Sequence, residues 1–216
     1  MNRKLIIHIM IILTLLVAVS CIFTPYALKK YRKYCAVKAY HEFIEGKRDC
    51  MGQDILSLAT PTGEPKRRYA TKYFITDSTG DEVPELHVWG RICAVFTFDH
   101  DEMAILDSFA SSSAGMYYLL NNGVMIYNEY VKNVFGNYYY YFILDGDGNR
   151  IKKLSFGWED INDNQRFDID DIYVFNDTVC TMEDWFEKTE GYIYIDENGR
   201  ESVCDEAEWV MYCEAK

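Results

Sequence analysis

The stretch 137–156, NYYYYFILDGDGNRIKKLSF, decides the fold class. Two runs rich in aromatic and aliphatic residues flank DGDGN, a cluster of turn-forming residues at 145–149. Aromatic residues favour half-buried strands, and a short Asp/Gly/Asn cluster between two such runs is typical of a hairpin. The stretch therefore predicts two antiparallel strands joined by a tight turn.

The same signal recurs along the chain from Tyr69 onward. Short aromatic and β-branched runs alternate with turn residues, as in antiparallel hairpins. Thr181 precedes two acidic residues, where it can cap a short helix. We expect an α+β fold, mainly antiparallel β in hairpins or a meander, with an N-terminal membrane helix and one or two short helices. The predicted strands lie at 69–76, 85–89, 91–98, 103–110, 116–120, 124–130, 137–144, 150–156, 172–175 and 191–195, and the short helix at 181–189.

The first 28 residues predict attachment to a membrane. Residues 5–23 are an apolar run whose only ionisable side chain is His8. Such a run is long enough to span a bilayer, which favours an uncleaved transmembrane anchor. Two alternatives stay open. One is a cleaved signal peptide, and the other is a lipoprotein signal, in which AVSC at 18–21 is a loose lipobox that ends at a lipidated Cys21.

A helix is also predicted at 25–46, either continuous with the anchor or bent near Pro25. Its expected apolar stripe consists of Tyr34, Val37, Tyr40 and Ile44. A loop follows at 60–65. The predicted organisation is a membrane anchor or signal segment at 1–28, a helix and linker at 29–65, and a single β-rich extracytoplasmic domain at 66–216.

The charge of the chain is sharply divided. Residues 1–38 hold seven basic residues and no acidic one, whereas the other 178 residues carry 15 basic and 34 acidic side chains, a net charge of −19. Nucleic-acid binding needs a basic surface, so this balance argues against a nucleic-acid partner. The basic cluster at 29–38 favours a cytoplasmic domain by the positive-inside bias, against the extracytoplasmic location predicted on other grounds.

The stretch DINDNQRFDIDD, 160–171, is a candidate calcium loop. Oxygen-bearing residues stand at positions 1, 3, 5, 7, 9 and 12, which is the spacing of a twelve-residue calcium loop. Gln165 stands where the sharp turn prefers Gly, and an Asp replaces the usual bidentate Glu at the end. A solvated acidic turn is the alternative. The predicted ligands of the calcium ion are Asp160, Asn162, Asn164, Arg166 (through its carbonyl), Asp168 and Asp171.

Three resemblances add to this interpretation. The loop at 160–171 resembles that of an EF-hand or dockerin, although its flanks are predicted strands. DSTGDEVPEL, 77–86, resembles the acidic loop of FG-GAP/VCBS repeats. Over most of 36–213, the motifs AYHEFIEGK, DSTGDEVPELHV and FNDTVCTMEDW resemble small, uncharacterised, membrane-anchored (lipoprotein-like) surface proteins of clostridial-type bacteria. This last resemblance implies a surface location and no assigned activity.

The sequence therefore predicts a surface module for binding or structure, held at the cell membrane through residues 5–23. Its domain is expected on the extracytoplasmic side, and its partner is left open between a protein and a glycan. No catalytic constellation is recognisable, because the histidines are scattered and SSSAG at 111–115 departs from G-x-S-x-G. The alternative from another class is a surface-attached, glycan-active enzyme that uses acidic residues. The cysteines are expected to be free thiols more than disulfides.

Overall fold

The chain combines one long helix with antiparallel sheets. The computed structural model describes residues 3–52, 72–89, 92–110, 115–130, 135–197 and 199–211. The elements are α1 (Arg3–Ile44), β1 (Lys72–Thr76), β2 (Glu85–Trp89), β3 (Ile92–Asp99), β4 (Glu102–Ala110), β5 (Gly115–Leu119), β6 (Met125–Tyr130), β7 (Phe135–Leu144), β8 (Arg150–Asp160), β9 (Ile172–Phe175), β10 (Thr178–Cys180), α3 (Met182–Thr189), β11 (Ile193–Ile195), β12 (Glu201–Val203) and β13 (Val210–Met211).

The strands form a five-stranded sheet, a six-stranded sheet and a two-stranded ribbon. Their orders are β13-β1-β2-β3-β4, β10-β9-β8-β7-β6-β5 and β11-β12. Every pairing is antiparallel, and most neighbours in a sheet are also neighbours in sequence. The prediction of an α+β fold built mainly from antiparallel hairpins is therefore confirmed. The hairpins predicted at 116–130 and 137–156 form as β5–β6 and β7–β8.

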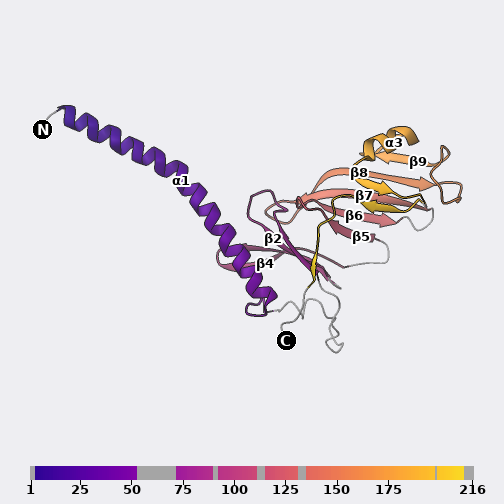
Figure 1. The fold of residues 1–216 in the computed structure, drawn as a ribbon, viewed down its shortest axis with the longest axis horizontal. Helices are drawn as coiled ribbons and strands as arrows, with labels where there is room; N and C mark the ends of the chain where they lie inside the picture. The colour runs from indigo at the N-terminus through magenta and orange to yellow at the C-terminus, as the bar shows by residue number, and fades with distance from the viewer. Residues whose placement is uncertain are drawn as a thin grey trace.

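Helix α1 is longer than the helix predicted at 25–46. It runs unbroken from Arg3 to Ile44, with Pro25 inside it. Figure 1 shows the helix bending part-way along. Proline explains a bend, because it lacks the N–H that would bond four residues back and its ring crowds the preceding turn. The N-terminal half of α1 extends away from the sheets, and its C-terminal half lies against them (Figure 1).

The C-terminal half of α1 packs on the five-stranded sheet. Ala36, Ala39, Tyr40 and Phe43 are buried against residues of β2 and β3, and the Tyr40 hydroxyl donates to the Pro84 carbonyl at 3.0 Å. The predicted apolar stripe is correct at its C-terminal end and wrong at Tyr34, which is 65% exposed. The small residues Ala36 and Ala39 allow the helix to approach the sheet closely. The buried face of the helix is therefore centred on these residues and not on Tyr34.

The predicted membrane anchor falls largely on residues whose side chains are not described. Of residues 5–23, side chains are described only for Met10, Thr14 and Phe23, all exposed. Across the part of the chain that the structure describes, no helix has the length and apolarity needed to cross a membrane. The anchor at 5–23 therefore stays a prediction. The predicted loop at 60–65 lies outside the described residues.

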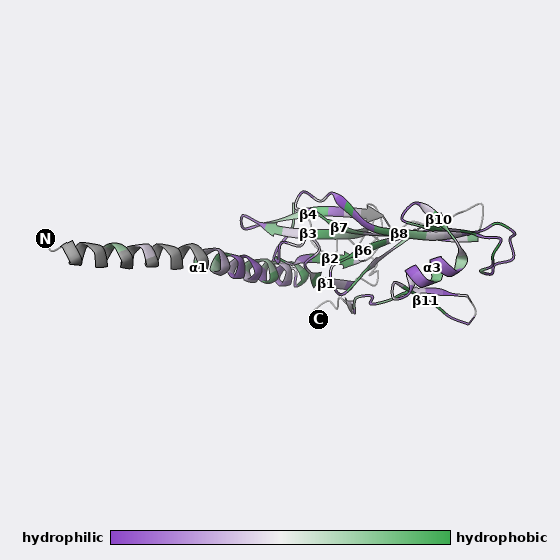
Figure 2. Ribbon diagram, turned by 90° about the horizontal axis from the view of Figure 1, so that it is seen from above, coloured by the Kyte–Doolittle hydropathy of each residue, from purple (hydrophilic) through white to green (hydrophobic). Residues whose placement is uncertain are grey.

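The two faces of the six-stranded sheet have different neighbours. One face carries α3 and the β11–β12 ribbon, around the fully buried Trp185 (Figure 2). Thr181 caps α3 as predicted, because its hydroxyl accepts the Asp184 N–H at 3.2 Å. Part of the opposite face packs on the five-stranded sheet through a cluster that includes Leu119, Phe142 and Val95. The rest of that face bears half-buried tyrosines.

Candidate functional site

The predicted calcium loop closes one end of the β8–β9 pair. Asp160 is the last residue of β8, and Asp171 immediately precedes β9. Because β8 and β9 are antiparallel neighbours, the two ends of the loop are held side by side. Both end carboxylates are buried, with Asp160 1% and Asp171 8% exposed. Burying a carboxylate is unfavourable unless hydrogen bonds or a cation compensate it.

The carboxylate of Asp160 organises the first half of the loop. It accepts the Asn164 N–H at 3.2 Å and the Gln165 N–H at 2.6 Å. Asn162 and Asn164 continue the pattern, since each side-chain oxygen accepts the N–H two residues on. Gln165 has φ +59, in the left-handed region that suits glycine. The sequence argument that this turn prefers Gly is thus confirmed by the backbone.

Asp168 and Asp171 organise the second half. Asp168 accepts the side-chain amides of Asn162 at 2.9 Å and Asn164 at 2.5 Å. These two hydrogen bonds hold the pKa of the Asp168 carboxyl below its ordinary value. Asp171 accepts the N–H groups of Asp168 at 2.9 Å and Ile161 at 3.3 Å, and the Tyr173 hydroxyl at 3.3 Å.

The loop thus brings the five predicted side-chain ligands into one hydrogen-bonded turn. Arg166, whose carbonyl is the sixth predicted ligand, is exposed. Within the described residues, no group of three His, Cys, Asp or Glu side chains is placed to hold a metal ion. A calcium ion would therefore need the amide oxygens of Asn162 and Asn164 beside the carboxylates. Carboxylate and amide oxygens are the hard ligands that Ca²⁺ takes, so the donor types fit.

The second acidic loop, at 77–85, surrounds a buried polar cluster. Glu85 is 2% exposed and accepts the Ser78 N–H at 2.8 Å and the Ser78 hydroxyl at 3.0 Å. The His87 Nε2 lies 3.2 Å from the same hydroxyl. Burial raises the pKa of Glu85 to about 7 and lowers that of His87 to about 3. Ser78 is 2% exposed, so this Ser/His/Glu set cannot meet a substrate and supports the fold.

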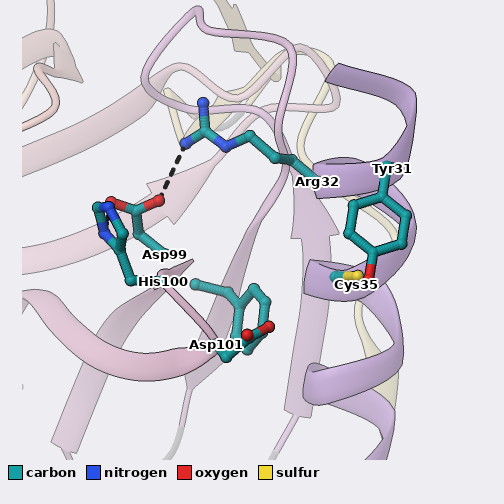
Figure 3. A pocket seen from close by; sticks show the side chains of 7 residues that line it. Tyr31, Arg32, Cys35, Asp99, His100 and Asp101 are labelled. Carbon is teal, nitrogen blue, oxygen red and sulfur yellow. Dashed lines mark hydrogen bonds and ion pairs between the residues drawn. The ribbon is translucent and has the colours of Figure 1, made fainter. Parts of the chain in front are cut away.

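An open groove of about 480 Å³ lies between α1 and the β3–β4 turn (Figure 3). Arg32 extends from the helix to Asp99 at 3.4 Å, and the His100 Nδ1 lies 2.7 Å from the same carboxylate. The Arg32 and Asp99 side chains are 52% exposed, and that of His100 is 93% exposed. Solvent therefore screens these charges, and the cluster lacks the desolvation that tunes catalytic groups.

A row of tyrosines lines the open part of the six-stranded sheet. Tyr117, Tyr127 and Tyr140 are direct cross-strand partners on β5, β6 and β7, so they share one face. Tyr138 lies two residues along β7 on the same face. Their ring centroids are 4.8 Å apart for 117–127, 6.2 Å for 127–140 and 6.4 Å for 138–140. All four side chains are half-buried.

The sequence analysis did not single out this tyrosine row. The signal was present in the alternation of tyrosines along the predicted strands, but grouping them requires the register of three strands. Four of the cysteines, Cys35, Cys50, Cys180 and Cys204, carry free thiols, as expected.

Comparison with known proteins gives no relative from which a role can be transferred. No protein-family model, no curated protein and no solved structure matches the chain significantly. The resemblances to EF-hand, FG-GAP/VCBS and membrane-anchored surface proteins therefore stay predictions. The function has to be argued from the geometry of the chain itself.

Proposed function

We propose that the protein is a membrane-anchored surface module for binding, with a structural calcium ion in the 160–171 loop. The N-terminal half of α1 serves as the anchor, and the sheets stand on the extracytoplasmic side. The open tyrosine face of the six-stranded sheet is the binding surface. The observation that carries the proposal is the loop, in which two buried carboxylates, Asp160 and Asp171, frame a set of hard oxygen donors.

The anchor proposal rests on the apolar run at 5–23 and its place in the fold. The run belongs to the half of α1 that extends away from the sheets (Figure 1), so it is available to a bilayer. A continuous helix carries the chain from this run to the five-stranded sheet. A lipidated Cys21 would hold the domain at the same surface by a different chemistry.

The calcium proposal rests on the charge and position of the loop. Asp160, Asp168 and Asp171 would offset the charge of the ion, and Asn162, Asn164 and the Arg166 carbonyl would complete the oxygen set. Asp160 ends β8 and Asp171 immediately precedes β9, and these two strands are paired. An ion bound to both residues would therefore stabilise this end of the sheet. We expect weak binding, with a Kd on the order of 10⁻⁴ to 10⁻³ M, as in extracellular modules.

A glycan-active enzyme needs two carboxylates that face each other in a cleft. In the groove of Figure 3, Asp99 is engaged by Arg32 and His100, and all three are exposed. The buried carboxylate Glu85 is enclosed by the fold. No observation in the described residues favours this alternative, and we do not propose it.

Calorimetric titration of the detergent-solubilised chain with CaCl₂ tests the calcium proposal. The wild type should bind one ion at millimolar concentration, and Asp160→Ala should abolish the binding heat. Asp170→Ala is the matched control, because Asp170 is an exposed acid of the same loop outside the predicted ligand set. Equal binding by the Asp160→Ala variant, or no calcium heat in the wild type, would leave the loop as an acidic turn.

A further inference from the structure

The ring of Tyr138 lies flat on the six-stranded sheet. A Cβ atom added at Gly157, its cross-strand neighbour, would be 2.5 Å from Tyr138 Cδ1 and 2.6 Å from Cγ. The ring therefore covers the bare backbone of β8, and its hydroxyl donates to Glu159 at 2.7 Å. The Tyr138 side chain is half-buried, so part of the ring stays open to solvent.

The neighbouring rings continue this surface. The plane of Tyr140 is inclined by 19° to that of Tyr138, and the plane of Tyr127 by 22° to that of Tyr140. Tyr138 and Tyr140 follow each other along one strand, and Tyr127 lies across from Tyr140 on the next strand. Three near-parallel rings in these positions make a shallow aromatic floor. A groove of about 350 Å³ lies over part of it.

The rim of this groove is polar, but its cations are already paired. Arg150 binds Asp107 at 2.9 Å, and Lys152 binds Asp177 at 2.7 Å. A polyanion would have to compete with these carboxylates, and the net charge of −19 beyond residue 38 would repel it. The charge of the domain therefore favours an uncharged ligand over an anionic one. Such a ligand must also offer flat apolar faces to the floor and hydrogen-bonding groups to the rim.

We propose that this tyrosine face binds a neutral glycan chain. Sugar rings combine apolar faces, which would stack on Tyr127, Tyr138 and Tyr140, with hydroxyl groups for the polar rim. The hydroxyls of Tyr127 and Tyr140 have no hydrogen-bond partner within the described residues, so they are available to such a ligand. The inference rests on the proposed function, because it names the ligand class of the binding module.

The test uses the detergent-solubilised full chain on an array of neutral gluco-, manno-, galacto- and N-acetylglucosamine oligosaccharides. A polyproline peptide and an anionic polysaccharide are included as competing ligand classes. We expect binding to at least one neutral series. The affinity for the best oligosaccharide should fall about tenfold in Tyr138→Ala and in Tyr140→Ala, since each removes one stacking ring.

Three further variants separate stacking from general damage. Tyr140→Phe keeps the ring and should retain most of the affinity, and Gly157→Ala should weaken binding by displacing the Tyr138 ring. Tyr194→Ala is the matched control, because this tyrosine is 62% exposed on β11, outside the face. Melting temperatures identify any variant that fails to fold.

Three results would overturn the inference. They are no neutral glycan bound above the level of a Tyr138→Ala/Tyr140→Ala double variant, preferential binding of the polyproline or anionic ligand, or an equal loss in Tyr194→Ala. Different results would reject the proposed function, namely the absence of calcium binding or of membrane association. Failure on the array alone would therefore reject only the glycan.

Discussion

At the scale of single residues, the most informative position is Gln165. Its φ of +59 places a side-chain-bearing residue in the left-handed region, where a Cβ crowds the following carbonyl. The Asp160 carboxylate stabilises this strained conformation, because it accepts the Gln165 N–H at 2.6 Å. The residue therefore tests whether the loop is an organised site or a loose turn.

We expect Gln165→Gly to raise the free energy of unfolding by about 0.5 to 1 kcal/mol, because glycine adopts this conformation without the Cβ clash. Gln165→Ala is the matched control, since alanine keeps the clash and should give no gain. Urea denaturation of both variants at saturating calcium measures the difference. Equal stability of the Gly and Ala variants would show that the turn is not left-handed in solution.

Glu85 makes the second prediction at this scale. Its folded pKa of about 7 lies above the ordinary value near 4.5, because burial disfavours the carboxylate. The folded state therefore binds more protons than the unfolded state between these two values, and stability falls as the pH rises from about 4.5 to 7. The loss attributable to Glu85 is on the order of 3 kcal/mol.

Thermal denaturation across this pH range should show a smaller loss in Glu85→Gln than in the wild type. Glutamine can still accept the Ser78 hydrogen bonds through its amide oxygen but does not titrate. Parallel pH profiles for the two proteins would contradict the assignment of a raised pKa to Glu85.

At the scale of elements, Glu201 fastens the β11–β12 ribbon to the six-stranded sheet. Its carboxylate accepts the Tyr139 hydroxyl at 2.5 Å, the Asn137 amide at 3.2 Å and the Trp158 indole N–H. These donors come from β7 and β8, so one side chain joins two sheets. Burial raises the pKa of the Glu201 carboxyl above its ordinary value.

Glu201→Ala should destabilise the protein by about 3 kcal/mol or more, because it leaves three donors without their partner. Glu187→Ala on the exposed face of α3 is the control and should change stability by less than about 0.5 kcal/mol. Urea denaturation gives both values. A small effect of Glu201→Ala would mean that water replaces the carboxylate and that the ribbon is held by its apolar contacts alone.

The elements also separate what the sequence could predict from what it could not. The turn at 145–149 was predictable, since hairpins are specified by adjacent residues. In the pairing of β1 with β13, Lys72 lies opposite Met211. Residues so far apart in the chain give no local sequence pattern from which the pairing could be predicted. At the candidate loop, the spacing of the oxygen ligands could be predicted from the sequence. The burial of Asp160 could not, because it follows from the β8–β9 pairing. The tyrosine face was missed because it depends on strand register.

At the scale of the whole molecule, the two larger sheets meet at the β7–β8 turn. A Cβ atom at Gly148 would lie 2.2 Å from the carbonyl oxygen of Leu106 on β4, and Gly148 has φ +82. The Leu144 N–H donates to the Ser78 carbonyl at 3.0 Å, beside the same junction. The backbones of the two sheets thus approach closely at this turn, where a side chain on Gly148 would keep them apart.

Gly148→Ala should cost about 2 kcal/mol or more, from a left-handed φ and a clash with backbone. Gly146→Ala in the same turn is a matched control, because nothing lies within 4 Å of its Cβ position. It should be close to neutral. Equal melting temperatures for the two variants would contradict the close junction of the sheets.

The account as a whole depends on where the domain stands relative to the membrane. The measurement that tests this most directly is digestion of intact cells by added protease, followed by fractionation and mass analysis. We predict a membrane-bound protein whose sheets are digested without lysis, leaving a fragment that contains residues 5–23 or a lipidated Cys21. A domain that stays protected until the cells are lysed, or a chain recovered in the soluble fraction, would contradict the account.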